Sequence, residues 1–266
     1  MNLQAIIFDW AGTTIDYGCF APVAVFVEVF RRQGVEISIA EARAPMGLQK
    51  RDHIRAITQM SAVTDRWQAT HQRPVTEADI EAMYADSVVV QSASVSAHAE
   101  LIPGTLEMVA WCRARGLKIG STTGYSRAVM DVLEPLARAA GYAPDAIIVP
   151  DDAPAGRPAP WMMYHNAMQL NVYPMSRVVK VGDTVPDMEE GRNADAWTIG
   201  VSMTGNELGL SAAEVKALAP AELDARLQPI EAKLRAAGAH EVVRSVAELP
   251  AVLEAIEARL AAGEKP

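Results

Sequence analysis

The alternation of apolar and polar residues changes character near residue 100. From there onward, short β-branched runs alternate with longer segments of helical periodicity, which is typical of a parallel sheet with crossover helices. An earlier apolar run ends at Asp9 and predicts one more buried strand. The later strands are predicted at residues 117–121, 146–149, 178–181, 197–201 and 241–243.

The stretch from roughly residue 17 to residue 98 has a different pattern, helical throughout and without a convincing strand. Within it, Thr76 followed by Asp79 matches a capping box, so we expect a long helix from there toward Ser96. The chain therefore contains a helical insertion after its first predicted strand.

These patterns predict an α/β fold in two parts. We expect a core with a Rossmann-like parallel sheet from residues 1–17 and 99–266, and an inserted all-helical domain over residues 18–98. The length of 266 residues fits one domain with a sizeable insertion. Half of the residues are hydrophobic and 21% are charged, a balance that is typical of a globular chain.

Charge and composition exclude several classes of partner. A formal net charge of −9 disfavours nucleic acid, so any anion must be met by a few placed cations. No stretch approaches the ~18 apolar residues of a membrane span. The first residues carry no basic segment of a secretion signal, and the two cysteines, Cys19 and Cys112, suit a reducing compartment. We therefore expect a cytoplasmic protein that binds neither nucleic acid nor a membrane.

Acidic residues follow two of the predicted strands. Asp9 ends the first strand and is followed by Gly12 and two threonines, and Asp183 follows the strand at 178–181. Asp187 lies one turn further on, in a helix that Pro186 begins. Each aspartate alone is equally consistent with a helix cap, but ligands bind at the carboxyl edge of such sheets. Three carboxylates there favour a Mg²⁺ site.

Two further strand ends carry groups that suit a phosphoryl ligand. Thr123 and Gly124 follow the strand at 117–121 and offer a hydroxyl and a backbone N–H, and Arg157 follows the strand at 146–149. A lone threonine or arginine is more often a cap or a surface charge. Together with a metal, however, a hydroxyl and a fixed cation would neutralise a phosphoryl group.

In this order of motifs the sequence resembles the haloacid dehalogenase superfamily. That superfamily has an aspartate nucleophile after its first strand, a Thr or Ser after the second, a Lys or Arg before a helix, and an acidic pair after the fourth. The matching residues are Asp9, Thr123, Arg157, Asp183 and Asp187. The resemblance implies that the helical insertion is a cap domain.

One departure from the superfamily pattern concerns the leaving group. Phosphatases of the superfamily carry a second aspartate two residues after the nucleophile, and here that position is Ala11. An oxygen leaving group would then depart without a general acid. A carbon leaving group fits better, because a protonated imine can accept the electrons of a broken C–P bond. Another phosphatase or phosphomutase, or a non-catalytic phosphate-binding module, stays an alternative.

An imine requires an amine, which directs attention to the lysines at positions 50, 118, 180, 216, 233 and 265. Lys118 and Lys180 are predicted to begin strands at the end opposite the site, and the last three lie in the C-terminal tail. Lys50 is left as the candidate, with an exposed helix lysine as the plain alternative. A helix starting at Gly47 would place Lys50 and His53 on one face, where His53 could shuttle protons or lower the lysine pKa.

Five segments together resemble one branch of the superfamily, which hydrolyses the C–P bond of a phosphonate aldehyde. They are FDWAGTTIDYGCFAP, MGLQKRDH, GSTTGY, GRPAPWM and VGDTVPD. The resemblance implies a homodimer with one Mg²⁺ per site, acting on a small-molecule phosphonate. It implies that Lys50 forms a Schiff base, that Asp9 is nucleophile and metal ligand, and that the Ala11 backbone carbonyl and Asp183 complete the protein ligands. Asp187 would lie behind these metal ligands or contact the metal through a water molecule.

The resemblance also assigns residues that hold the substrate. Thr123 and Arg157 would bind the phosphonate, assisted by the backbone near Gly12 and Gly124. The side of the pocket that belongs to the cap would be lined by Cys19, Met46, His53 and Tyr125. For Cys19 and Met46 simple core packing is the alternative, since both residue types are usually buried.

Overall fold

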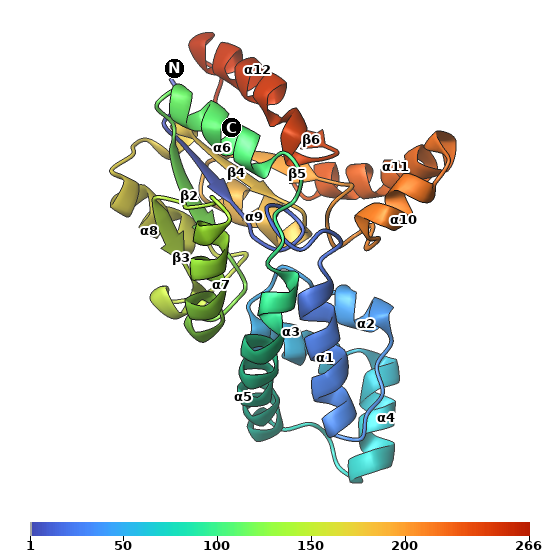
Figure 1. The fold of residues 1–266 in the computed structure, drawn as a ribbon. Coiled ribbons are helices and arrows are strands. Elements are labelled where there is room, and N and C mark those ends of the chain that lie inside the picture. Colours follow the sequence, from blue (N-terminus) through green and yellow to red (C-terminus); the bar gives the residue numbers. More distant parts are fainter. Residues whose placement is uncertain (1) are drawn as a thin grey trace.

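The computed structural model describes residues 2–266 (Figure 1). The strands are β1 (Ala5–Phe8), β2 (Lys118–Thr122), β3 (Ala146–Ile148), β4 (Val178–Gly182), β5 (Trp197–Val201) and β6 (Glu241–Val243). The helices are α1 (Phe20–Arg32), α2 (Ile39–Arg43), α3 (Lys50–Thr58), α4 (Ser61–His71), α5 (Glu77–Ser94), α6 (Thr105–Ala114), α7 (Arg127–Ala139), α8 (Trp161–Leu170), α9 (Val185–Asn193), α10 (Ala212–Ala217), α11 (Pro220–Ala236) and α12 (Leu249–Ala261). Short 3₁₀ turns are η1 (Val95–His98), η2 (Pro150–Asp152), η3 (Met175–Arg177) and η4 (Val246–Glu248).

The strands form one parallel sheet in the order β3-β2-β1-β4-β5-β6. This order and the crossover helices confirm the predicted α/β fold with a Rossmann-like sheet. The register pairs Phe8 with Ser121 on one side and with Val181 on the other. Because the strands are parallel and in register, the loops after β1, β2 and β4 meet at one edge of the sheet.

Both faces of the sheet are covered, as the sequence of β1 requires. Ile6 and Phe8 pack in a cluster that includes residues of α6 and α12, whereas Ala5 and Ile7 pack in a cluster with residues of α8. Successive side chains of a strand point to opposite faces, so a strand buried on both sides is apolar at every position. That burial explains the continuous apolar run before Asp9.

The helices α1 to α5 with η1, here called the helical bundle, lie beside the carboxyl edge of the sheet (Figure 1). Within the bundle α5 packs against α1 and α3, and it also contacts α7 of the sheet part, here called the core. The predicted capping box is present, with the Thr76 side chain accepting from the Asp79 N–H at the start of α5. Among the described residues, no helix is both long and apolar enough to cross a bilayer.

The predicted start of the helix that carries Lys50 is wrong. Gly47 lies in a turn with a left-handed φ of +95°, and α3 begins only at Lys50, after the extended residue Gln49. Lys50 and His53 are nevertheless one turn apart on α3, as the sequence predicted. The later start places Lys50 at the end of a loop that faces the core.

A prediction concerns Gly182, the last residue of β4. A Cβ atom there would lie 2.2 Å from Cγ of Asp187, so the strand approaches α9 too closely for any side chain. We expect Gly182→Ala to lower the free energy of unfolding by about 1–3 kcal/mol, measured by urea denaturation, because the added methyl group overpacks this contact.

The matched control is Gly200→Ala in the neighbouring strand β5. A Cβ atom there would lie 3.0 Å from a methyl carbon of Leu234, a side chain that can yield. We therefore expect Gly200→Ala to lower the free energy of unfolding by less than Gly182→Ala does. Equal losses, or the reverse order, would show that the approach of β4 to α9 is not a steric constraint on the fold.

Candidate active site

A cleft lies where the carboxyl edge of the sheet meets the helical bundle. The loops after β1, β2, β3 and β4 supply one wall, and the start of α1 and the loop before α3 supply the other. Most of the residues predicted for the site line this cleft, namely Asp9, Ala11, Cys19, Met46, Lys50, Thr123, Gly124, Tyr125, Arg157 and Asp183. Of the other predicted residues, Gly12, His53 and Asp187 lie behind its wall.

Three buried carboxylates meet beneath the cleft. Asp9, Asp183 and Asp187 each place a carboxylate oxygen within 4.8 Å of the others. Burial raises the pKa of Asp9 and of Asp183. The charge of Arg157 partly offsets the rise at Asp9, whereas the charges of Asp9 and Asp187 raise the pKa of Asp183 further. Burial acts on Asp187 as well, but the charges of Arg157 and Lys180 lower the pKa of this carboxyl below its usual range.

The donor set suits a hard divalent cation such as Mg²⁺. All three side chains offer oxygen atoms, and Ala11 lines the same cleft. Asp187 already forms ion pairs with Arg157 and Lys180 and accepts a hydrogen bond from Thr184, so its charge is offset by the protein. The raised pKa values of Asp9 and Asp183 indicate acidic groups that lack enough positive charge, which a metal would supply.

Arg157 is fixed by three hydrogen bonds and by an ion pair with Asp187. Its Nη2 lies 2.7 Å from Oδ1 of Asp9 and 2.9 Å from Oγ1 of Thr122. Its Nη1 lies 2.9 Å from Oδ1 of Asp187, and its Nε lies 3.1 Å from Oε2 of Glu190. The guanidinium is therefore held beside the predicted nucleophile with its orientation set on every side.

The predicted position of Lys180 is wrong. It was expected at the end of its strand opposite the site, but its ammonium group lies beside the carboxylates of Asp187 and Glu190. Nζ lies 2.7 Å from Oγ1 of Thr122, 2.9 Å from Oδ1 of Asp187 and 3.1 Å from Oε2 of Glu190. Lys180 is fully buried, and all three of its partners are oxygen atoms, two of them from carboxylates.

Lys50 has the opposite surroundings. It is 5% exposed, and among the described residues no hydrogen bond or ion pair involves its Nζ. The amine lies 5.1 Å from the ring centroid of Phe26 and 5.0 Å from that of Tyr125. Burial between these rings lowers the pKa of Lys50 to about 8, which gives a neutral amine at mildly alkaline pH.

His53 lies behind Lys50 rather than in the cleft. Its Nε2 lies 2.9 Å from the carbonyl oxygen of Ala42, and because a carbonyl only accepts, this nitrogen carries the proton. The ring stacks on Phe26 with 3.7 Å between centroids. Burial, and then the charge of Lys50, lower the pKa of His53 well below its usual value. It is therefore burial, and not a charged His53, that lowers the pKa of Lys50.

At the two glycines predicted to lie near the ligand, Gly12 and Gly124, neighbouring atoms leave no space for a side chain. At Gly12 the φ is +81°, and a Cβ atom would lie 2.5 Å from Oδ2 of Asp183. At Gly124 a Cβ atom would lie 2.8 Å from the carbonyl oxygen of Leu48, in the loop before Lys50. Gly12 therefore permits the approach of Asp183, and Gly124 permits the approach of the bundle.

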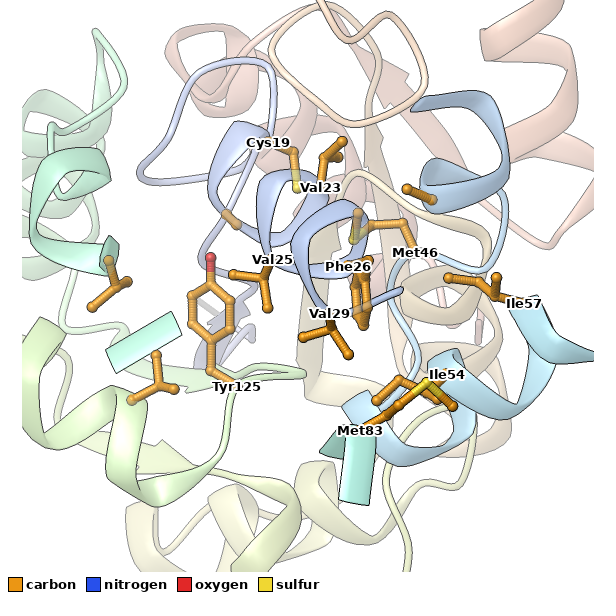
Figure 2. Packing of buried hydrophobic residues seen from close by; sticks show 14 of the residues in the cluster. Cys19, Val23, Val25, Phe26, Val29, Met46, Ile54, Ile57, Met83 and Tyr125 are labelled. Carbon is orange, nitrogen blue, oxygen red and sulfur yellow. The ribbon is translucent and has the colours of Figure 1, made fainter. Parts of the chain in front are cut away.

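Three residues predicted to line the cleft, Cys19, Met46 and Tyr125, come from different elements and belong to the buried cluster drawn in Figure 2. Cys19 caps α1, Met46 lies in the loop before α3, and Tyr125 follows β2; all three belong to one buried cluster. Burial raises the pKa of the Cys19 thiol and of the Tyr125 hydroxyl, so both are uncharged near neutral pH. Among the described residues the Tyr125 hydroxyl has no hydrogen-bond partner.

Sequence reasoning missed Thr122, Lys180 and Glu190, which hold Arg157 and Asp187 in place. For Lys180 a signal was present, because a lysine within the apolar run of β4 is unusual unless its charge is paired. Glu190 lies one turn after Asp187 on α9, a spacing that shares a face. Nothing in the sequence singles out Thr122 over the neighbouring Thr123.

The chain was compared with known proteins. A family model for haloacid dehalogenase-like hydrolases matches residues 3–195. A phosphonoacetaldehyde hydrolase of Bacillus cytotoxicus is 49% identical over 257 residues, which cover 97% of this chain and 97% of the relative. One from Nitratidesulfovibrio vulgaris is 48% identical over 264 residues, which cover 99% of this chain and 94% of the relative. The crystal structure of a phosphonoacetaldehyde hydrolase-like protein from Oleispira antarctica matches with a TM-score of 0.98 at 40% identity, covering 100% of this chain and 96% of that one.

These matches extend well beyond the motifs around the cleft. The family model covers the core strands β1 to β4 with the helical bundle, and both relatives continue through the C-terminal helices. The chain therefore belongs to the haloacid dehalogenase-like hydrolases, within the branch of its relatives the phosphonoacetaldehyde hydrolases.

Proposed function

We propose that this protein hydrolyses the C–P bond of phosphonoacetaldehyde, giving acetaldehyde and phosphate in phosphonate breakdown. The observation that carries the proposal is the buried, unpaired amine of Lys50 in the same cleft as Asp9. Ala11 stands where phosphatases of the superfamily have their general acid, so this cleft is poorly suited to an oxygen leaving group. The names of the relatives support the same reaction.

The first step is condensation of Lys50 with the aldehyde. The neutral amine attacks the carbonyl carbon, water leaves, and the product is a protonated imine. Burial favours the neutral amine before the reaction, and the aromatic faces of Phe26 and Tyr125 would stabilise the iminium cation after it.

The second step transfers the phosphoryl group. A carboxylate oxygen of Asp9 attacks phosphorus, the C–P bond breaks, and its electron pair moves into the imine to give an enamine. Protonation at carbon regenerates an imine, and one water releases acetaldehyde from Lys50 while a second releases phosphate from Asp9. The water lost in the first step balances one of these, so the net reaction consumes one water.

Arg157 and Thr123 are proposed to bind the phosphonate oxygens, since both line the cleft beside Asp9. Asp9, Asp183 and the Ala11 carbonyl are proposed to hold Mg²⁺, with Asp187 behind them. Bound there, the metal would neutralise phosphonate charge that otherwise repels the nucleophile. The protein itself must keep Asp9 ionised and oriented toward the phosphorus atom, and the ion pair with Arg157 supports both.

We also propose the wider setting of the reaction. The segment at residues 18–98 is a cap domain that closes over the core residues 1–17 and 99–266 and brings Lys50 to Asp9. The protein works in the cytoplasm, consistent with free thiols at both cysteines.

We further propose that the protein is a homodimer. Large apolar side chains are exposed along and after α8, and they support a partner subunit on that face; they are Trp161, Met168 and Tyr173.

Trapping the imine tests the mechanism directly. Phosphonoacetaldehyde followed by borohydride should leave one reduced adduct on Lys50, located by peptide mass mapping. Lys50→Arg should form no adduct and release no phosphate from this substrate. The control Lys233→Arg, 49% exposed beside Glu207, should behave as wild type. An adduct on another lysine would contradict the mechanism, as would equal hydrolysis of phosphate monoesters by wild type and Lys50→Arg.

Replacing the nucleophile should separate the two steps. We expect Asp9→Asn to keep the Lys50 adduct but to lose phosphate release by roughly 10³-fold or more, because an amide cannot attack phosphorus. The exposed Asp195→Asn is the matched control and should leave phosphate release unchanged. Substantial phosphate release by Asp9→Asn would exclude an aspartyl-phosphate intermediate.

The pH dependence of trapping should follow the lowered pKa of Lys50. Only the neutral amine attacks the aldehyde, so the initial trapping rate should rise with pH up to about 8 and then level off. Cyanoborohydride trapping without added Mg²⁺, over a series of buffers, measures this profile. A rate that continues to climb toward the ordinary lysine pKa of 10.5 would show that burial does not activate the amine.

A further inference from the structure

One half-buried side chain of the helical bundle binds to loops of the core. Arg43, the last residue of α2, inserts its guanidinium among loops of the core and the start of α1. Nη1 lies 3.0 Å from the carbonyl oxygen of Gly18 and 3.0 Å from Oδ1 of Asn206. Among the described residues no carboxylate pairs with Arg43, so all of its partners are neutral oxygens.

The contact between Arg43 and Asn206 is reciprocal. Oδ1 and the backbone oxygen of Asn206 accept from Arg43, while Nδ2 of Asn206 donates to the Arg43 carbonyl oxygen at 3.2 Å. Asn206 is only 2% exposed, so this pairing satisfies a buried amide. On the other side of the guanidinium, a Cβ atom at Gly209 would lie 2.8 Å from Cζ of Arg43. We call these two side chains the Arg43–Asn206 clasp.

Asn206 also reaches the acidic centre. Its backbone N–H donates to Oδ2 of Asp183 at 2.7 Å, the shorter of the two described hydrogen bonds to this carboxylate. The same loop contacts the nucleophile loop, where Thr204 Oγ1 donates to the Gly12 carbonyl oxygen at 2.7 Å. The loop after β5 therefore connects the helical bundle with both acidic strand ends.

Arg43 likewise connects to Lys50 along the chain. It begins the short segment at residues 43–50, which carries Met46 and ends at the amine. That segment lies tightly on the core, because a Cβ atom at Gly47 would lie 2.2 Å from Oγ1 of Thr184. Docking of Arg43 therefore fixes one end of the segment whose other end is the reactive lysine.

We propose that Arg43 and Asn206 are positioning residues that couple the docking of the helical bundle to the orientation of the Asp183 carboxylate. With the clasp formed, Asn206 presents its N–H to Oδ2 and sets the plane of Asp183. With the clasp broken, the loop is released, and Asp183 loses its shortest hydrogen bond. The inference rests on the proposed function in one respect, that Asp183 is a metal ligand.

Coupling of this kind is reciprocal. If docking of the bundle increases the affinity of Asp183 for Mg²⁺, then bound Mg²⁺ must favour docking of the bundle by an equal free energy. The segment at residues 43–50 should therefore exchange its amide hydrogens more slowly when Mg²⁺ is added to the wild-type protein. A clasp that merely stabilised the fold would not produce this response to the metal.

The experiment uses the full-length protein and Mg²⁺ alone, without substrate. Calorimetric titration should show Arg43→Met binding Mg²⁺ about 5- to 10-fold more weakly than wild type. Hydrogen exchange of this variant should lose the Mg²⁺-dependent protection of residues 43–50. Asn206→Ala keeps its backbone N–H and carbonyl oxygen but loses both side-chain hydrogen bonds to Arg43, so it should show the same two losses. The double variant should be no weaker than either single variant.

A matched control separates the clasp from loss of any bundle arginine. Arg31→Met removes an arginine whose side chain is 58% exposed and, within residues 2–266, pairs with Glu28 alone, so this variant should bind Mg²⁺ as wild type does. Arg43→Lys, which keeps the charge with fewer donors, should fall between wild type and Arg43→Met. It also serves as the test variant if the methionine variant fails to fold.

The outcomes distinguish this inference from the proposed reaction. Wild-type Mg²⁺ affinity in Arg43→Met, or losses that multiply in the double variant, would overturn the coupling even if Lys50 is trapped by substrate. Conversely, the expected losses in Mg²⁺ affinity and protection would support the coupling even if no Lys50 adduct formed, and that missing adduct would contradict the proposed reaction alone.

Discussion

The structure depends on pairing buried charges at the carboxyl edge of the sheet. Arg157 and Lys180 lie among Asp9, Asp187 and Glu190 with almost no solvent to screen them. Buried charges are costly unless each has a partner, and removing one partner costs more than the pair contributes. Asp187 and Glu190 are balanced by the two cations, which leaves Asp9 and Asp183 as the acids that still require positive charge. This imbalance explains why a metal and a cationic substrate adduct suit the cleft.

The two reactive groups obtain their properties from opposite environments. Asp9 lies beside Arg157, whose charge favours the ionised carboxylate that a nucleophile needs. Lys50 lies between aromatic rings, where burial favours the neutral amine. A single polar pocket could not serve both needs. The cleft between the carboxyl edge of the sheet and the helical bundle contains both environments, because Asp9 and Lys50 line it together.

Much of this arrangement was predictable from the sequence, for a physical reason. Residues that follow strands in parallel register must meet at one edge, so Asp9, Thr123, Arg157 and Asp183 could be brought together before any coordinates were known. Lys180 was misplaced because its position in the strand predicts where its backbone lies and not how far four methylene groups reach. Arg43 and Asn206 come from segments whose contact depends on how the bundle docks, which local periodicity does not determine.

The claim that Lys50 and Asp9 act on one substrate from opposite sides is tested most directly by diffraction. Asp9→Asn protein, reduced with borohydride after addition of phosphonoacetaldehyde, would retain the phosphonate on its lysine tether. The account predicts the adduct on Lys50, with the phosphonate beside Arg157 and Thr123 and the side chain at position 9 facing phosphorus opposite the C–P bond. A phosphonate directed away from position 9, or a tether on any other lysine, would contradict it.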